Sequence, residues 1–365
     1  MLNSGEIFVR GFDTEKDDYY QEKLNFSPTM YVESNTESDK HSLFGIPLKP
    51  LKFESITSTK EKIQEYKELG IKIYGMDDFV CSFISDNFTA DFEPSRTRVF
   101  YVDIENRIAG RDGKKTRPDG HAAKNPITAI TIYDSLTGIY HVWGSQDHVW
   151  ENVDYQHLKV EYKVFSKEKL MLEDFLLFWK KNYPNIVTGW NVDGYDIPYI
   201  YNRLKKVFSA SIAKELSPLQ RITERKIGKN VYYIMAGISV VDYMKTYKKM
   251  SLKSPDNWKL DTIAFNELGL GKVDYRDEGY LDLDDLEKRN PQKFIDYNIR
   301  DVESIVDIEA KNRFMDIVIA TAHYSLVNYD DVQSVIKCWD SITHNFLKSQ
   351  NIVTSPRQTF VKSES

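Results

Sequence analysis

The stretch RVFYVDIENR places two acids beside an apolar run, Val99–Ile104, whose β-branched and aromatic residues are typical of a central strand. Side chains two positions apart on a strand point to the same face, so Asp103 and Glu105 converge while Val102 and Ile104 face the other way. Neighbouring buried anions are costly unless a cation or a shared proton offsets their charge. The stretch therefore predicts a metal site, a shared proton or a strand end that reaches water.

The tetrapeptide VDIE of this stretch occurs a second time, with Asp307 and Glu309 as its acids. This copy lies in a long predicted helix that has Asn290 as its N-cap and Pro291 at its first position. Residues two apart on a helix are about 200° apart around its axis, so these two acids diverge. We interpret the second copy as solvated helix surface and only the first as a candidate site.

Two other segments supply acids that could join Asp103 and Glu105. Asp196 follows the apolar stretch NIVTGWN at the start of a predicted helix, where taken alone it is more typical of a helix cap. Tyr297 and Asp301 are four apart on one helix face, which alone is typical of ordinary surface. Together the four acids form an all-oxygen ligand set of the kind that Mg²⁺ or Mn²⁺ prefers. Two such ions about 4 Å apart serve in-line phosphodiester cleavage.

The chain changes character near residue 98. The first 97 residues favour a β-rich region with a helix near Lys60–Leu69 and a short strand at Val80–Ser85, and nothing in them looks catalytic. Strands at 126–133 and 139–143, an amphipathic helix within 166–184 and a buried strand near 185–191 follow. Three strands, a helix and a further strand favour a mixed α/β sheet.

Cysteine content, apolar runs and charge limit the classes of protein to which this chain can belong. The two cysteines, Cys81 and Cys338, form no CxxC motif, which argues against structural zinc and favours a reducing compartment. No apolar run approaches 18 residues and the N-terminus has no signal-like core, so we expect a cytosolic protein without a membrane span.

Residues 203–259 carry a net charge of +9 although the whole chain carries −6. This predicts either a groove for a polyanion or a solvated basic surface.

The motifs DIE, NVDGYD and YNIRD resemble, in order and approximate spacing, the three exonuclease motifs of family B DNA polymerases. The flanks KIYGMDDF, TGWNVDGYDIPYIYNRLK and AGISVVDYMKTYKK are similar to those of T-even-type phage polymerases, and the likeness runs from about residue 6 to the end. The resemblance implies an α/β, RNase H-like (DnaQ-type) exonuclease domain with a mixed sheet over residues 98–313. It also implies a discontinuous α+β N-terminal domain, made of residues 1–97 and a returning segment, 314–365.

The same resemblance implies a role for each site residue. Asp103 is expected to bridge two divalent metal ions, Mg²⁺ or Mn²⁺, while Glu105 and Asp301 complete the site on the nucleophile side. Asp196 is expected to hold the second ion, partly through water. Tyr297 is expected to orient the attacking water.

Contacts with DNA follow from the resemblance and from the basic region. The expected nucleic-acid-binding residues are Asn191, Lys226, Lys229, Lys249 and Lys253. A hairpin near Ile222–Met235 is expected to help separate primer from template at the entrance, the alternative being a plain surface hairpin. His121 stands where some relatives carry an aromatic residue, so no base-stacking role is assigned to it.

Polymerase motifs of the family do not occur in the sequence. The palm's Asp-x-x-Ser-Leu-Tyr-Pro-Ser, the fingers' Lys-x₃-Asn-Ser-x-Tyr-Gly and the Asp-Thr-Asp-Ser signature are all missing. The resemblance therefore implies the proofreading 3′→5′ exonuclease portion of a phage polymerase, acting on primer-template and single-stranded 3′ ends in the cytoplasm of an infected bacterium. We expect palm, fingers and thumb on a separate chain, which would also bring a sliding clamp, or else a sequence cut short before its palm. The alternatives are a stand-alone DnaQ-like repair or RNA-trimming exonuclease and a non-catalytic nucleic-acid-binding or assembly subunit.

Overall fold

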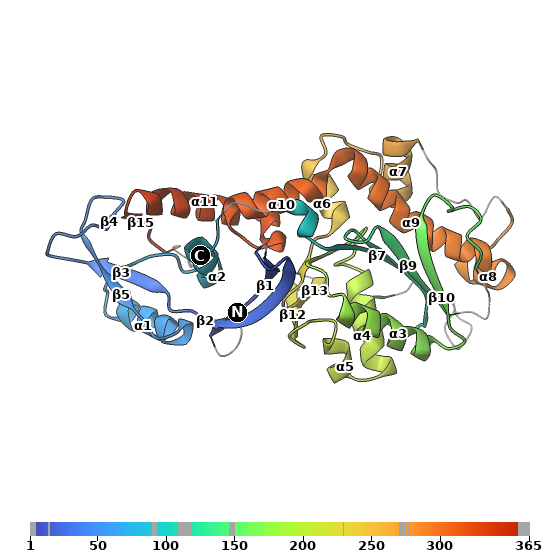
Figure 1. Ribbon diagram of the computed structural model, residues 1–365, viewed down its shortest axis with the longest axis horizontal. Coiled ribbons are helices and arrows are strands. Elements are labelled where there is room, and N and C mark those ends of the chain that lie inside the picture. The colour runs from blue at the N-terminus through green and yellow to red at the C-terminus, as the bar shows by residue number, and fades with distance from the viewer. Residues whose placement is uncertain are drawn as a thin grey trace, which may run out of the picture. The chain divides into compact units, whose positions relative to one another are not determined.

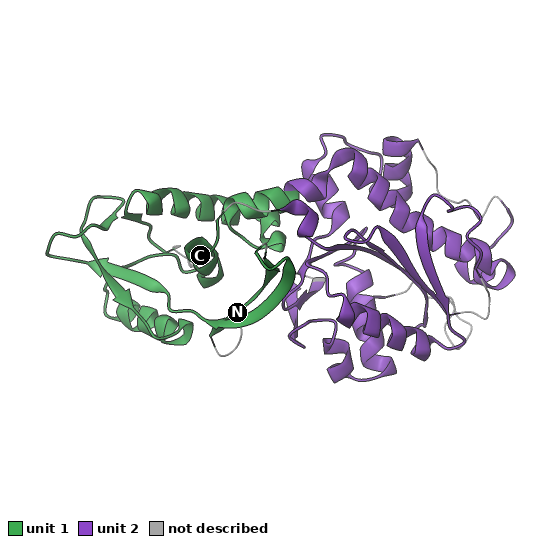
Figure 2. Ribbon diagram, viewed as in Figure 1, with its two compact units in different colours: residues 1–92, 318–365 green, residues 93–317 purple. Residues whose placement is uncertain are grey.

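A computed structural model describes residues 5–13, 15–89, 93–108, 119–145, 150–228, 230–269, 275 and 278–356. The chain divides into two compact units, one of residues 1–92 and 318–365 and the other of residues 93–317 (Figure 2). The boundaries expected from the sequence, 97/98 and 313/314, fall within a few residues of these. No helix in the described ranges is both long enough and apolar enough to cross a lipid bilayer.

The first unit is built on a small antiparallel sheet whose central strand is β3, with β5 and β6 on either side (Figure 1). Its strands are β1 (Glu6–Asp13), β2 (Asp18–Asn25), β3 (Thr29–Glu33), β4 (His41–Ser42), β5 (Leu48–Lys52), β6 (Ile73–Tyr74) and β15 (Ile352–Val353). Its helices are α1 (Ile56–Glu68), α2 (Phe79–Asn87) and α11 (Val335–Ser349), with a short 3-10 turn at Tyr329–Gln333. Strand β15 pairs with β4 in parallel, so the returning segment is hydrogen-bonded into the N-terminal one.

The strand predicted at Val80–Ser85 is wrong, because these residues lie in helix α2. The Asp78 carboxylate accepts hydrogen bonds from the backbone N–H groups of Val80 and Cys81, at 3.2 and 3.1 Å. An aspartate in this position satisfies donors that the first helical turn would otherwise leave unpaired. The cap at Asp78 was the sequence signal for a helix here.

The second unit contains a six-stranded mixed sheet in the order β10-β9-β8-β7-β11-β14. Its strands are β7 (Val99–Asn106), β8 (Ile127–Asp134), β9 (Ile139–Gly144), β10 (Lys159–Val164), β11 (Ile186–Thr188) and β14 (Ser239–Val240). Strand β8 runs antiparallel to β7 and β9, and the remaining pairs are parallel. This arrangement confirms the predicted mixed α/β fold class.

Helices cover both faces of this sheet (Figure 1). The helices of this unit are α3 (Glu168–Lys181), α4 (Asp196–Val207), α5 (Ala210–Lys214), α6 (Tyr243–Met250), α7 (Leu260–Leu268), α8 (Leu283–Arg289) and α9 (Pro291–Asn312), and α10 (Phe314–Ser325) includes the residues at which the two units divide. Helices α3 and α4 pack against one face, and α9 lies on the other, over β7 and β8. A separate hairpin, β12 (Ile222–Ile227) with β13 (Asn230–Met235), has the strands predicted for it.

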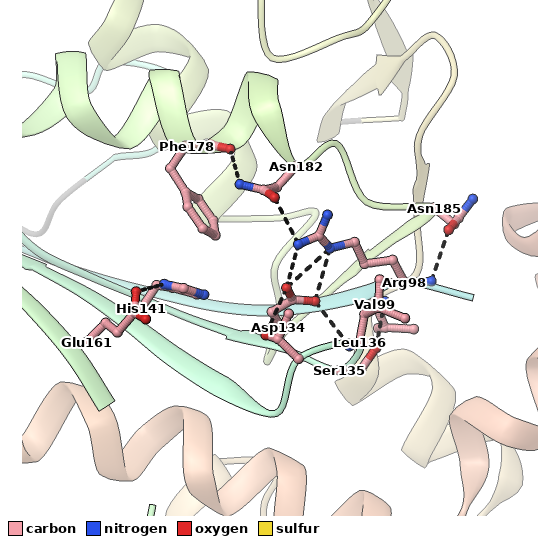
Figure 3. A network of polar contacts seen from close by, with 11 residues as sticks. Arg98, Val99, Asp134, Ser135, Leu136, His141, Glu161, Phe178, Asn182 and Asn185 are labelled. Carbon is pink, nitrogen blue, oxygen red and sulfur yellow. Dashed lines mark hydrogen bonds and ion pairs between the residues drawn. The ribbon is translucent and has the colours of Figure 1, made fainter. Parts of the chain in front are cut away.

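Strand β7 is fixed at its beginning by Arg98 (Figure 3). The guanidinium donates to the buried Asp134 carboxylate at the end of β8, at 2.6 Å from Nη2, and to Asn182 Oδ1 just after α3, at 3.0 Å. The Arg98 backbone N–H donates to Asn185 Oδ1, which precedes β11, at 2.9 Å. Charge-assisted bonds of this forked kind are strong and directional. They tie four segments together at the end of β7 remote from its acids.

Candidate active site

The two faces of β7 differ in chemistry. Phe100, Val102 and Ile104 belong to the apolar core that β7 shares with α3 and α4. Asp103 and Glu105 alternate with them and therefore face the side covered by α9. The predicted division of the strand into an apolar and an acidic face is what the structure shows.

Three of the predicted acids meet on the α9 side of the sheet. Asp103, Glu105 and Asp301 each offer a carboxylate oxygen within 4.8 Å of the other two, and all three are partly buried. Asp301 is held there by α9, which begins as predicted, with the Asn290 side chain accepting the N–H of Lys293 at 3.1 Å and Pro291 at the first position. Like charges this close disfavour one another unless a cation joins them. An all-carboxylate donor set suits Mg²⁺ or Mn²⁺, so the residues fit the divalent ions expected here.

Asp196 stands just outside this cluster. It is the first residue of α4 and is buried, with 3% of its surface exposed. Burial and the negative charge of Asp103 raise its pKa well above the ordinary value, which places it within electrostatic reach of Asp103. The N-cap position of α4 is held by Tyr195, so Asp196 is not the cap. It is a buried acid that feels the charge of Asp103.

Tyr297 lies one turn before Asp301 on α9 and is buried, with 5% exposed. Burial and the charges of Asp301 and Glu105 raise its pKa far above the ordinary value. Its hydroxyl therefore stays protonated at neutral pH. A protonated phenol beside a carboxylate cluster can hold a water molecule by hydrogen bonding.

Sequence reasoning missed Asn298 and Thr131. The Asn298 amide donates to Asp103 Oδ2 at 2.7 Å and accepts from the Thr131 hydroxyl. Asn298 lies inside the YNIRD motif, but an asparagine within a helix and a threonine within a strand carry no signal of their own. The pairing of β7 with β8 sets Thr131 opposite Asp103, and the packing of α9 over the sheet brings Asn298 to both.

The second VDIE copy corrects another prediction, since neither of its acids is solvated surface: both are partly buried. The Glu309 carboxylate accepts the backbone N–H groups of Met315 and Asp316 at the start of α10, at 3.0 and 3.3 Å. It also accepts the Tyr243 hydroxyl at 2.8 Å. Among the described residues neither Asp307 nor Glu309 joins the carboxylate cluster, so the first copy alone contributes to the candidate site.

The predicted DNA-binding residues lie on separate segments. Asn191 has a left-handed backbone, with φ of 66°, in the turn between β11 and α4. Lys226 lies on the exposed strand β12 and Lys249 on α6, while Lys229 lies outside the described residues. Lys253 is paired with Glu267 at 2.8 Å, so its charge is already partly matched.

Comparisons with known proteins agree with the geometry. The sequence model of the DNA polymerase family B exonuclease domain matches residues 76–263, about half of the chain. The DNA-directed DNA polymerase of Escherichia phage RB69 is 32% identical over 95% of this chain and 40% of its own length. That of Enterobacteria phage T4 is 28% identical over 98% of this chain and 42% of its own length. A DNA polymerase of Choristoneura fumiferana nuclear polyhedrosis virus is 25% identical over 60% of this chain and 23% of its own length.

The two phage relatives align with nearly the whole chain, including the helix that carries Tyr297 and Asp301, which the family model does not reach. The chain spans about two fifths of the length of these relatives. The acidic strand β7, the buried Asp196 and the matching exonuclease-domain model point the same way. This chain belongs to DNA polymerase family B and carries that family's exonuclease domain.

Proposed function

We propose that this chain is a proofreading 3′→5′ exonuclease that hydrolyses 3′-terminal nucleotides from single-stranded DNA with two divalent metal ions. The observation that carries the proposal is the meeting of Asp103, Glu105 and Asp301 within 4.8 Å. Family membership supports the reaction class and the use of a divalent metal. The second ion and the preference for single strands follow from the resemblance described above.

Each residue has a role in this proposal. Asp103 would contact both ions, Glu105 and Asp301 would complete the first site, and Asp196 would serve the second. Bound ions of this kind lower the pKa of water and stabilise a leaving oxygen. The protonated hydroxyl of Tyr297 would hold the attacking water in line with the phosphate.

The surroundings offer surfaces for DNA. Every residue of β12 after Ile222 is exposed, and Arg225 and Lys226 lie on it. We propose that this hairpin contacts primer or template where a 3′ end enters, and that Asn191 and the lysines of residues 203–259 contact the backbone. Lysine contacts of this type give binding that weakens as salt rises.

We further propose that this chain acts in the host cytoplasm together with palm, fingers and thumb domains and a sliding clamp. The relatives are polymerases more than twice as long as the part matched here. Helix α11 presents large apolar side chains to solvent, namely Val335, Ile336, Trp339 and Phe346, each 54–66% exposed. A stable interface with the palm, fingers and thumb domains should bury more than about 2,000 Å² in total. Trp339→Asp should weaken capture of a palm-bearing partner and leave exonuclease activity unchanged.

The decisive experiment uses the purified chain and a single-stranded oligonucleotide labelled at its 5′ end. With Mg²⁺ or Mn²⁺ we expect a ladder of products shortened from the 3′ end, and with EDTA none. We expect no nucleotide incorporation on a primer-template. Binding of DNA without metal-dependent digestion would overturn the proposal in favour of a non-catalytic subunit. Template-directed synthesis by the chain alone would overturn the proposal that synthesis needs palm, fingers and thumb domains.

A further inference from the structure

A buried asparagine touches the acid expected to contact both ions. Asn298 has no solvent exposure, and its Nδ2 donates to Asp103 Oδ2 at 2.7 Å. Its Oδ1 accepts a hydrogen bond from Thr131 Oγ1 at 2.5 Å. Both polar atoms of the amide are therefore hydrogen-bonded, Nδ2 to an acid of the candidate site and Oδ1 to a threonine outside it.

The sheet fixes the relation between the two partners of this amide. Thr131 on β8 is the cross-strand partner of Asp103 on β7, and it too is fully buried. Directly opposite residues of an antiparallel pair project side by side on the same face. Asn298 bridges them from α9, so three elements meet in one closed set of contacts.

The chemistry of these groups permits one orientation of the amide. The reverse orientation would set the amide oxygen against the Asp103 carboxylate, two acceptors with no proton between them. The Thr131 hydroxyl, which can rotate, donates to Oδ1 and secures the observed orientation. Nδ2 is thereby held toward Asp103.

A neutral donor has a specific advantage beside a metal ligand. Asp103 stands among like charges, Glu105 and Asp301, which favour turning its carboxylate away from them. A hydrogen bond from the Asn298 amide opposes this rotation, because it restrains the carboxylate. A lysine or arginine would do the same but would place a competing cation where the metal must bind.

We propose that Asn298 is a positioning residue, locked by Thr131, that holds the Asp103 carboxylate in the orientation that binds divalent cations. The inference rests on the proposed function in so far as Asp103 is a metal ligand. Partners that orient metal ligands typically contribute about 10-fold to 100-fold to metal affinity.

The test measures Mn²⁺ binding to the whole chain by titration calorimetry without DNA. Asn298→Leu keeps the branching of the side chain at Cγ and removes the donor, and we expect it to weaken Mn²⁺ affinity about 10-fold to 100-fold. Thr131→Val removes only the hydroxyl that fixes the orientation of the Asn298 amide. We expect it to weaken Mn²⁺ affinity as well, but less than Asn298→Leu does. Exonuclease assays should show a matching rise in the Mg²⁺ concentration that gives half the maximal rate, with most of the rate recovered at saturating metal.

Ile299→Ala is the matched control, because Ile299 is the next residue of α9, is equally buried and has an apolar side chain that cannot form a hydrogen bond. We expect it to lower stability while Mn²⁺ affinity stays unchanged. Wild-type affinity in both Asn298→Leu and Thr131→Val would overturn the inference. If Asn298→Leu does not fold, wild-type Mn²⁺ affinity in Thr131→Val alone would overturn the inference. A wild-type chain that neither binds Mn²⁺ nor digests DNA would instead overturn the proposed function, and this inference with it.

Discussion

Asp103 on β7 and Asp301 on α9 offer carboxylate oxygens within 4.8 Å of each other, although the two residues belong to distant parts of the chain. Strand alternation turns Asp103 away from the apolar core, and α9 crosses the face to which it turns. The candidate site is therefore made by the packing of one helix over one strand. Changes that disturb either acid should affect chemistry more than folding, since removing one of several like charges relieves repulsion.

Tyr297→Phe tests whether the buried hydroxyl takes part in the reaction. The substitution keeps the ring and its edge-on contact with Tyr275, whose centroid lies 5.7 Å away. We expect the single-turnover exonuclease rate to fall about 10-fold to 10³-fold, because the attacking water loses a partner that orients it. An unchanged rate would reduce Tyr297 to a packing residue of α9.

Glu309→Ala tests the structural role of the second VDIE copy. The substitution removes the acceptor for two N–H groups at the start of α10 and leaves the buried Tyr243 hydroxyl without it. We expect the free energy of unfolding to fall by about 1–3 kcal/mol, as for the loss of a helix cap or a buried acceptor. Tryptophan fluorescence during urea unfolding measures this free energy for the unit that contains Glu309. Five tryptophans lie in that unit, residues 93–317, namely Trp143, Trp150, Trp179, Trp190 and Trp258.

The control for Glu309→Ala is Asp307→Ala in the same tetrapeptide. Burial raises the pKa of Asp307, so its charge is disfavoured in the folded state and its loss should cost little. Equal unfolding free energies for the two variants would contradict the capping role of Glu309.

Glu267 gives a prediction for the pH dependence of stability. Burial alone would raise its pKa, but hydrogen bonds from Lys253, Tyr247 and Lys311 outweigh burial and lower it to about 2. Because the folded-state pKa lies below the ordinary value of 4.5, the stabilisation is full above pH 4.5 and is lost as the pH falls toward 2. We expect Glu267→Gln to be less stable than wild type by about 1.5–3 kcal/mol at pH 7. The difference should shrink between pH 4.5 and pH 3 in urea titrations, and a difference independent of pH would count against the charge of Glu267 as its source.

The fold could be predicted from the sequence where a local pattern and its tertiary setting agree. Strand β7, the hairpin β12–β13 and the capped start of α9 each combine a hydrophobic pattern with a turn or cap residue. Strand β10 was missed, because it is a mostly exposed edge of the sheet with little apolar patterning. The apolar residues of helix α2 taken alone favour a strand, and only the cap at Asp78 distinguishes the helix.

The candidate site could be predicted in part for a similar reason. Asp103, Glu105 and Asp196 stand out because each acid adjoins an apolar element, where a charge needs an explanation. Asn298 could not be found this way, since its importance depends on a contact between α9 and β7. The role of Glu309 was hidden likewise, because it arises only where the chain turns at Arg313, with φ of 56°, and α10 begins.

The duplicated tetrapeptide provides the most direct test of the central claim, that the carboxylates around Asp103 form the exonuclease site. The measurement is the rate of 3′-terminal nucleotide release from single-stranded DNA at saturating Mg²⁺ for Asp103→Ala and Asp307→Ala, each checked for folding by circular dichroism. We predict a loss of at least about 10³-fold, about 4 kcal/mol, for Asp103→Ala, because it removes a ligand on which the metal-dependent step depends. We predict a change of less than about twofold for Asp307→Ala. Retained activity in a folded Asp103→Ala variant, or an equal loss in both, would contradict the account.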